Sequence, residues 1–115
     1  MHIIRKINLS NFKTNKVNYI RNLFTECSSV KELDLSSFNI DKITELDYLF
    51  YDCKSLEKIN ISNFNTKNVF SMSFMFEGCS SLEQINFSYI NFKNASFIYN
   101  MFVNCIYKLK KKIKE

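Results

Sequence analysis

The chain has 115 residues, of which 46% are hydrophobic, and it carries one glycine, no proline and a formal net charge of +5 at pH 7. This length suits a single domain, and the composition excludes collagen-like chains, low-complexity chains and glycine-rich phosphate loops. No run of about 18 apolar residues marks a membrane helix, and the first residues lack the apolar stretch of a secretory signal. As written, the chain is therefore expected to stay in the cytoplasm.

A period of 26 residues organises the chain. The cysteines follow one another at this interval, at Cys27, Cys53, Cys79 and Cys105. The same interval separates serine, phenylalanine and asparagine positions. The phenylalanines, for example, are Phe24, Phe50, Phe76 and Phe102. Four copies without an insertion indicate a repeat architecture. We predict one domain over residues 1–107, with a basic tail or partial C-terminal cap at 108–115. Its repeats are expected at about 4–29, 30–55, 56–81 and 82–107.

The spacing of the apolar residues changes once within each unit. In residues 30–38 the apolar and polar side chains alternate, which predicts a strand. The apolar residues that follow are spaced as on one face of a short helix, and Thr44 to Asp47 resembles a capping box. Of the four residues that precede a cysteine, three tolerate a left-handed backbone, which suits a residue that closes this helix. The helical face is formed by Ile43, Leu46, Leu49, Phe50 and Cys53.

Units of this size cannot bury their apolar faces alone, because helices of two turns are marginal in water. Stacking the units side by side merges the apolar columns into one core. Strand crossovers of this kind are nearly always right-handed. The predicted fold class is therefore an α/β repeat: a short right-handed solenoid of leucine-rich-repeat type, with four strand-plus-short-helix units and a parallel sheet.

The third unit carries the most specific pattern. Residues 56–82 contain Ser-x-Phe-Asn-Thr from Ser62, then Asn-Val, then Met-x-x-Met-Phe from Met72, and Gly-Cys-Ser-Ser-Leu from Gly78. This sequence resembles the repeat of the BspA-like leucine-rich repeat surface protein family. The resemblance implies a repeat scaffold engaged in adhesion or protein–protein contact. It also implies a cell-surface location if the chain is part of a longer protein.

The four cysteines invite three interpretations. A column with one sulfur per repeat cannot converge on a tetrahedral metal site, which needs ligands around one point. Adjacent strands are about 4.8 Å apart, a spacing that permits disulfides between neighbouring repeats. Each cysteine also completes the apolar face of its unit, so we favour buried core thiols over disulfides, and disulfides over a metal. We predict no metal and no cofactor.

Catalytic groups are scarce. The chain has one histidine, His2, and no Ser/His/Asp or Cys/His set can be assembled around it. Most phenylalanines fall on the predicted core columns, where they cannot stack on nucleobases. We predict that the protein is not an enzyme and has no small-molecule substrate.

The outward positions of the strands provide the best candidate site. In a stack of this kind they line the concave sheet, where partners usually dock, so we predict a non-catalytic scaffold for protein–protein interaction. The same asparagines and serines could instead hydrogen-bond along the stack and hold its register. The candidate protein-binding face comprises Lys6, Asn8, Glu32, Asp34, Ser36, Lys58, Asn60, Ser62, Gln84, Asn86 and Ser88.

Two other functions stay open. Residues 108–115 hold five lysines and one glutamate, a net charge of +4, so residues 1–107 carry only +1 of the total +5. The tail is either a solvated terminus or a binding site for nucleic acid or an anionic membrane, both of which we consider unlikely partners. The chain could also be a truncated repeat remnant without a separate role. The uncovered ends of a four-unit stack further suggest end-to-end self-association.

Overall fold

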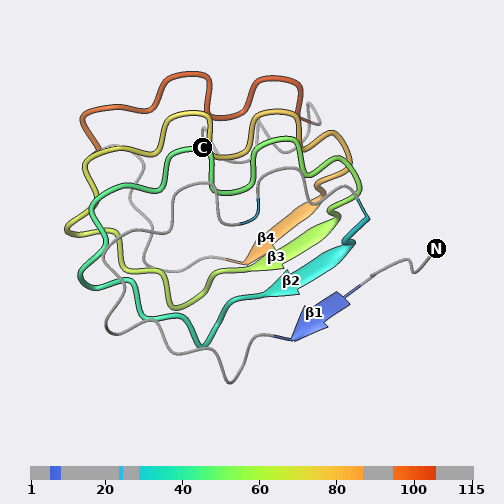
Figure 1. The fold of residues 1–115 in the computed structure, drawn as a ribbon, viewed down its shortest axis with the longest axis horizontal. Coiled ribbons are helices and arrows are strands. Elements are labelled where there is room, and N and C mark those ends of the chain that lie inside the picture. Colours follow the sequence, from blue (N-terminus) through green and yellow to red (C-terminus); the bar gives the residue numbers. More distant parts are fainter. Residues whose placement is uncertain (1–5, 9–23, 25–28, 87–94, 106–115) are drawn as a thin grey trace.

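A computed structural model of the chain describes residues 6–8, 24, 29–86 and 95–105, with only the backbone described for residues 6–8. These residues contain four strands of three residues each: β1 (Lys6–Asn8), β2 (Glu32–Asp34), β3 (Lys58–Asn60) and β4 (Gln84–Asn86). They form one sheet in the order β1-β2-β3-β4 (Figure 1). The order of the strands in space is thus their order along the chain.

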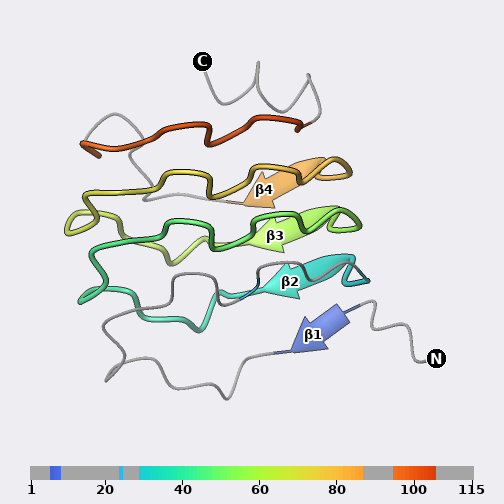
Figure 2. The same ribbon diagram turned by 45° about the horizontal axis from the view of Figure 1, so that its top comes forward.

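All three strand pairs are parallel, and their register follows the 26-residue period. Ile7 lies beside Leu33, Leu33 beside Ile59, and Ile59 beside Ile85. Figure 2 shows the strands from β1 to β4, and the passes of the chain that follow β2 and β3, lying one above another. We call each pass of 26 residues a coil. Equivalent residues are therefore neighbours in adjacent coils.

The predicted fold class, an α/β repeat of four strand-plus-short-helix units, is wrong. The described residues contain no helix, which contradicts an α/β solenoid of four strand-plus-helix units. The segment from Ile43 to Cys53, which was expected to be helical, consists of turns and one isolated bridge position. At that position Glu45 pairs in parallel with Ser71, and Ser71 pairs with Phe97.

Tandem tight turns replace the helix. The Leu49 N–H donates to the Leu46 carbonyl at 3.2 Å, and the Cys53 N–H donates to the Phe50 carbonyl at 3.2 Å. The third residue of each turn is left-handed, with φ of 61° at Tyr48 and 60° at Asp52. Positive φ at this position is the requirement of a type II turn. A left-handed residue every four positions is incompatible with a right-handed helix.

The intervening backbone N–H groups bond to the next coil. Those of Leu46, Tyr48, Phe50 and Asp52 donate at 2.8 to 3.1 Å to the carbonyls of Ser71, Ser73, Met75 and Glu77. A helix would direct the same N–H groups to carbonyls four residues earlier in its own coil. The next coil repeats the arrangement, with positive φ at Phe74 and Gly78. These bonds between coils explain why the turns replace the helix.

The left-handed backbone expected at three of the four residues that precede a cysteine is present. Asp52, Gly78 and Asn104 have φ of 60°, 81° and 62°, while Glu26 lies outside the described residues. These residues complete tight turns instead of closing a helix. At Gly78 a Cβ atom would meet the Asp52 carboxylate of the preceding coil. This close approach gives a packing reason for the chain's one glycine.

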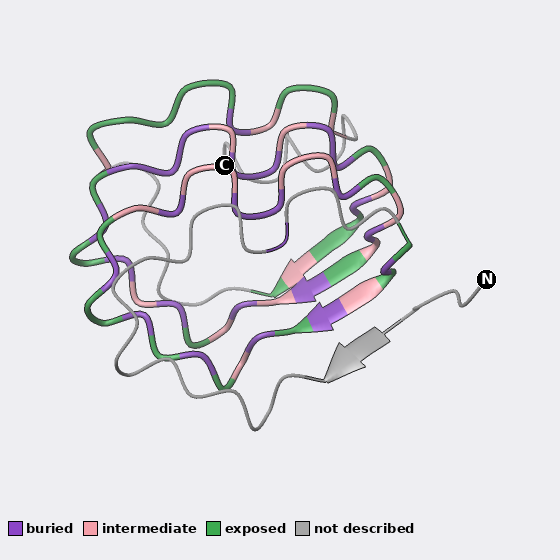
Figure 3. Cartoon of the chain, in the orientation of Figure 1, coloured by how far each residue is buried: buried purple, intermediate pink, exposed green. Residues whose placement is uncertain are grey.

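The core lies between the strands and the tandem turns. Its centre is a column of phenylalanine rings at 5.3 to 5.8 Å between centroids, nearly parallel to one another: Phe24, Phe50, Phe76 and Phe102. Figure 3 shows buried positions concentrated in the middle coils and exposed positions along much of residues 95–105. Burial therefore decreases at the last coil.

Several predictions about the chain's extent stay predictions. The tail at 108–115 lies outside the described residues, as does Ser88. The boundaries of the predicted domain and its four units are not determined by the strands alone. Within the described ranges, no helix is long and apolar enough to cross a membrane.

Candidate functional site

The outward side chains of β2, β3 and β4 form the main candidate site. The first residues of these strands are in register, as are the third residues, and the buried Leu33 and Ile59 alternate with them. All six line a shallow hollow of about 250 Å³. We call this set the strand face: Glu32, Asp34, Lys58, Asn60, Gln84 and Asn86.

The other predicted members of the face are placed only in part. The backbone of Lys6 pairs with that of Glu32, and the backbone of Asn8 pairs with that of Asp34. The register of the first and third strand residues therefore continues to β1. Ser36 and Ser62 are half-buried and follow the ends of β2 and β3. The structure therefore brings together most of the residues that the sequence analysis selected.

Two members of the strand face have a structural role. The Asp34 Oδ1 atom accepts the Ser36 N–H at 3.0 Å, and the Asn60 Oδ1 atom accepts the Ser62 N–H at 3.0 Å. Such Asx turns shape the backbone where a strand ends. The exposed side chains of Lys58 and Gln84 make no hydrogen bond to any residue that the structure describes. These two are thus the clearest candidates for contact with a partner.

The charges on the strand face are mixed. Glu32 and Asp34 on β2 are acidic, whereas Lys58 on β3 is basic. Just before the strands, the Lys31 Nζ atom lies 3.9 Å from a Glu57 carboxylate oxygen of the next coil. This exposed ion pair contributes little to stability. The face consequently offers a partner both signs of charge within a few ångströms.

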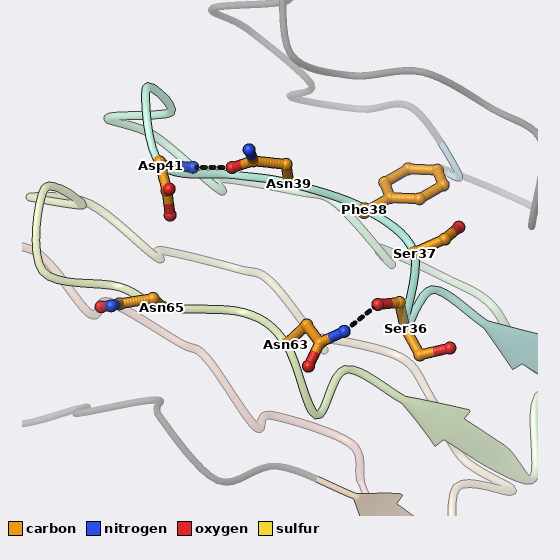
Figure 4. A pocket seen from close by; sticks show the side chains of 7 residues that line it. All are labelled: Ser36, Ser37, Phe38, Asn39, Asp41, Asn63 and Asn65. Atoms are coloured by element: carbon orange, nitrogen blue, oxygen red, sulfur yellow. Dashed lines mark hydrogen bonds between the residues drawn. The ribbon is translucent and has the colours of Figure 1, made fainter.

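A second hollow, which the sequence analysis missed, lies where the chain bends after β2 and β3. It has a volume of about 380 Å³ and is lined by Ser36, Ser37, Phe38, Asn39, Asp41, Asn63 and Asn65 (Figure 4). The Asn63 Nδ2 atom donates to the Ser36 carbonyl, and the Asn39 Oδ1 atom accepts the Asp41 N–H at 2.9 Å. The sequence feature that could have indicated this hollow is the spacing of Asn39 and Asn65, which are one period apart.

Asparagine side chains also tie neighbouring coils together. In addition to the bond from Asn63 to Ser36, the Asn68 Nδ2 atom donates to the Asp41 carbonyl at 2.6 Å. These are not the asparagines that were expected to hold the register, since Asn60 bonds within its own coil. The second hollow is thus bordered by amides that support the bends. Nowhere in the described ranges do three His, Cys, Asp or Glu side chains gather as metal ligands could.

The cysteines form a regular row of thiols. Cys53, Cys79 and Cys105 are free, and their Sγ atoms donate at 2.9 to 3.0 Å to carbonyls of the preceding coil, those of Phe24, Phe50 and Phe76. Cys53 and Cys79 are fully buried, Cys105 is half-buried, and Cys27 lies outside the described residues. Each thiol thus joins its turn to the coil before it.

This environment predicts a loss of stability in alkali. The neighbouring Cys53 thiol and burial both raise the pKa of Cys79 above its ordinary value of 9.0. Above that pH the unfolded chain releases a proton that the folded chain keeps, so unfolding becomes more favourable as pH rises. The expected slope is about 1.4 kcal/mol per pH unit for this thiol.

Denaturant unfolding between about pH 8 and pH 10.5 measures this slope. Lysines and tyrosines also titrate in this range, so the matched comparison is Cys79→Ala, which removes one thiol and leaves the other groups in place. The wild-type chain should lose stability with pH more steeply than the variant. Equal slopes would show that the Cys79 thiol ionises as easily in the folded chain as in the unfolded one.

A family model described as "Mycoplasma protein of unknown function, DUF285" matches residues 2–115. No curated protein matches the chain significantly, and no solved structure does either.

Proposed function

Since the chain belongs to the DUF285 family of Mycoplasma proteins of unknown function, we propose a role from its own geometry: it is a non-catalytic scaffold that binds another protein through the strand face. The observation that carries this proposal is the alignment of polar side chains across β2, β3 and β4. Adjacent strands place these groups about 4.8 Å apart. They lie opposite the buried strand residues, so the core does not require their polar ends.

The partner should be polar and carry both signs of charge. A basic group would pair with the acidic side chains of β2, and an acidic group would pair with Lys58 on β3. Because Asp34 and Lys58 are exposed, their charges would contribute to orientation and to the rate of encounter more than to affinity. Hydrogen bonds from Gln84 and Asn86 would extend the contact across β4.

The resemblance to BspA-like proteins supports an adhesion-type scaffold, and it bears on the scaffold more than on the partner. In the most similar unit the matching apolar residues are buried: Phe64, Met72, Met75 and Phe76. The shared pattern is thus a pattern of core packing. A surface location and an adhesive partner are the more specific parts of this proposal, and they come from the resemblance to BspA-like proteins.

A charge reversal at Lys58 tests the proposal. Lys58→Glu should weaken capture of a cross-linked partner by the full-length chain, and it should lower the rate constant for association with that purified partner about tenfold, because the encounter depends on these exposed charges. The control is Lys67→Glu, which makes the same change at another exposed position of the same coil. If both variants bind alike, the strand face is not the binding surface.

A further inference from the structure

The last described coil exposes a position that the preceding coils bury. Leu46 and Met72 are at equivalent positions and are completely buried, whereas Ile98, one period later, is 47% exposed. The difference arises because the next coil covers the first two. An aliphatic side chain of the core column is therefore left at the surface, in the same coil as the exposed Tyr99 and Val103.

Backbone donors are left at the same edge. In the coil of Met72, the N–H groups of Met72, Phe74 and Gly78 donate to carbonyls of the last coil at 2.7 to 2.9 Å. One period later, the N–H groups of Ile98, Asn100 and Asn104 have no hydrogen-bond partner among the described residues. An edge that combines open donors with apolar side chains is a template for another strand or coil.

We infer that this edge binds the first coil of a second copy of the chain, in a head-to-tail contact. The coil that fits the edge best is one with the same 26-residue geometry, because the open donors continue the spacing of those already satisfied between coils. The two ends of the sheet agree with this. In the described residues β1 pairs only with β2, and β4 pairs only with β3.

Charge complementarity also favours a second copy. Lys31 and Glu57 form an ion pair between adjacent coils, at the position just before each strand. In the last coil that position is the exposed Glu83, and in the first unit the sequence has Arg5 there. Stacking a last coil on a first coil would therefore place opposite charges next to each other, as between β2 and β3.

The weight-average mass of the full-length chain, measured by sedimentation over a range of concentrations, tests this inference. A head-to-tail contact does not close at two copies unless the rotation permits a ring. The mass should therefore rise past two chains as the concentration increases. A mass of one chain at every concentration, or a mass that stops at two chains, would overturn the inference.

Two matched variants locate the contact. Ile98→Glu places a charge on the open edge and should abolish association, while Phe70→Glu changes a side chain of similar exposure, 43%, in a coil that is already covered. Phe70→Glu should associate like the wild type. Association that persists in Ile98→Glu, or is lost equally in both variants, would contradict the inference. Circular dichroism confirms that each variant is folded.

A charge exchange tests the orientation. Glu83→Lys alone and Arg5→Glu alone should each reduce association, because each places like charges at the joint. Mixing the two variants should restore a contact between Glu83→Lys of one copy and Arg5→Glu of the other. If the mixture associates no better than either variant alone, the contact is not the head-to-tail one.

Discussion

Replacing Phe50 with alanine is expected to lower the free energy of unfolding by about 3–5 kcal/mol. The Phe50 ring is completely buried and lies between Phe24 and Phe76, at centroid distances of 5.8 and 5.5 Å. Its removal would leave a cavity inside the column and break two ring contacts. The backbone bonds of Phe50 to Met75 and Cys79 would have to hold the coils without the packing between them.

Denaturant unfolding measures this loss, and the same substitution at the end of the column is its control. Among the described residues Phe102 stacks on Phe76, and its side chain is only half-buried, whereas Phe50 is completely buried. Phe102→Ala should therefore cost clearly less than Phe50→Ala. Since small domains have total stabilities of about 5–15 kcal/mol, the Phe50 variant should be much closer to unfolding at room temperature. No loss in either variant would mean that the column does not stabilise the stack, and equal losses would mean that burial between two rings adds nothing to the contribution of a ring.

The strands were predictable because two independent patterns agreed on them. Alternation placed Leu33 inside and Asp34 outside, and the 26-residue period placed the same types at 59 and 60. Parallel pairing of equivalent residues follows, because only this register places apolar side chains next to apolar side chains. The backbone pairing of Leu33 with Ile59 follows this rule.

The turns were not predictable from apolar spacing. Core residues at steps of three and one fit a helix face and a pair of tight turns equally well. The choice depends on where the backbone N–H groups bond, and their partners lie in another coil. Positive φ is also unexpected at bulky aromatic residues. Tyr48 and Phe74 adopt it nevertheless, with their rings stacked at 4.7 Å between adjacent coils.

The candidate site, too, was predictable only in part. Alternation identified the outward residues of the strands, because their direction is fixed by the pleat. It did not show that Asp34 and Asn60 bond to the backbone two residues later, because that depends on the bend after each strand. The second hollow near Asn39 and Asn63 was missed for the same reason.

Asp47→Ala is expected to lower the free energy of unfolding by about 2–6 kcal/mol, since each of two buried groups that lose their partner costs about 1–3 kcal/mol. The Asp47 Oδ1 atom accepts the Ser71 Oγ–H at 2.5 Å and the Ser73 N–H at 2.9 Å. Both serines are buried and belong to the next coil. Asp47→Asn, which keeps an oxygen at this position, should cost less.

Asp41→Ala provides the control, because it removes an exposed carboxylate for which no hydrogen bond is present among the described residues. It should change stability by no more than about 0.5 kcal/mol. Hydrogen exchange at the Ser73 amide gives a local measurement, and protection there should fall in Asp47→Ala only. Equal behaviour of the two variants would contradict the proposed role of Asp47. Because the Ser73 Oγ atom accepts the Tyr99 N–H at 3.1 Å, the loss should also extend to the last coil and lower protection at Tyr99.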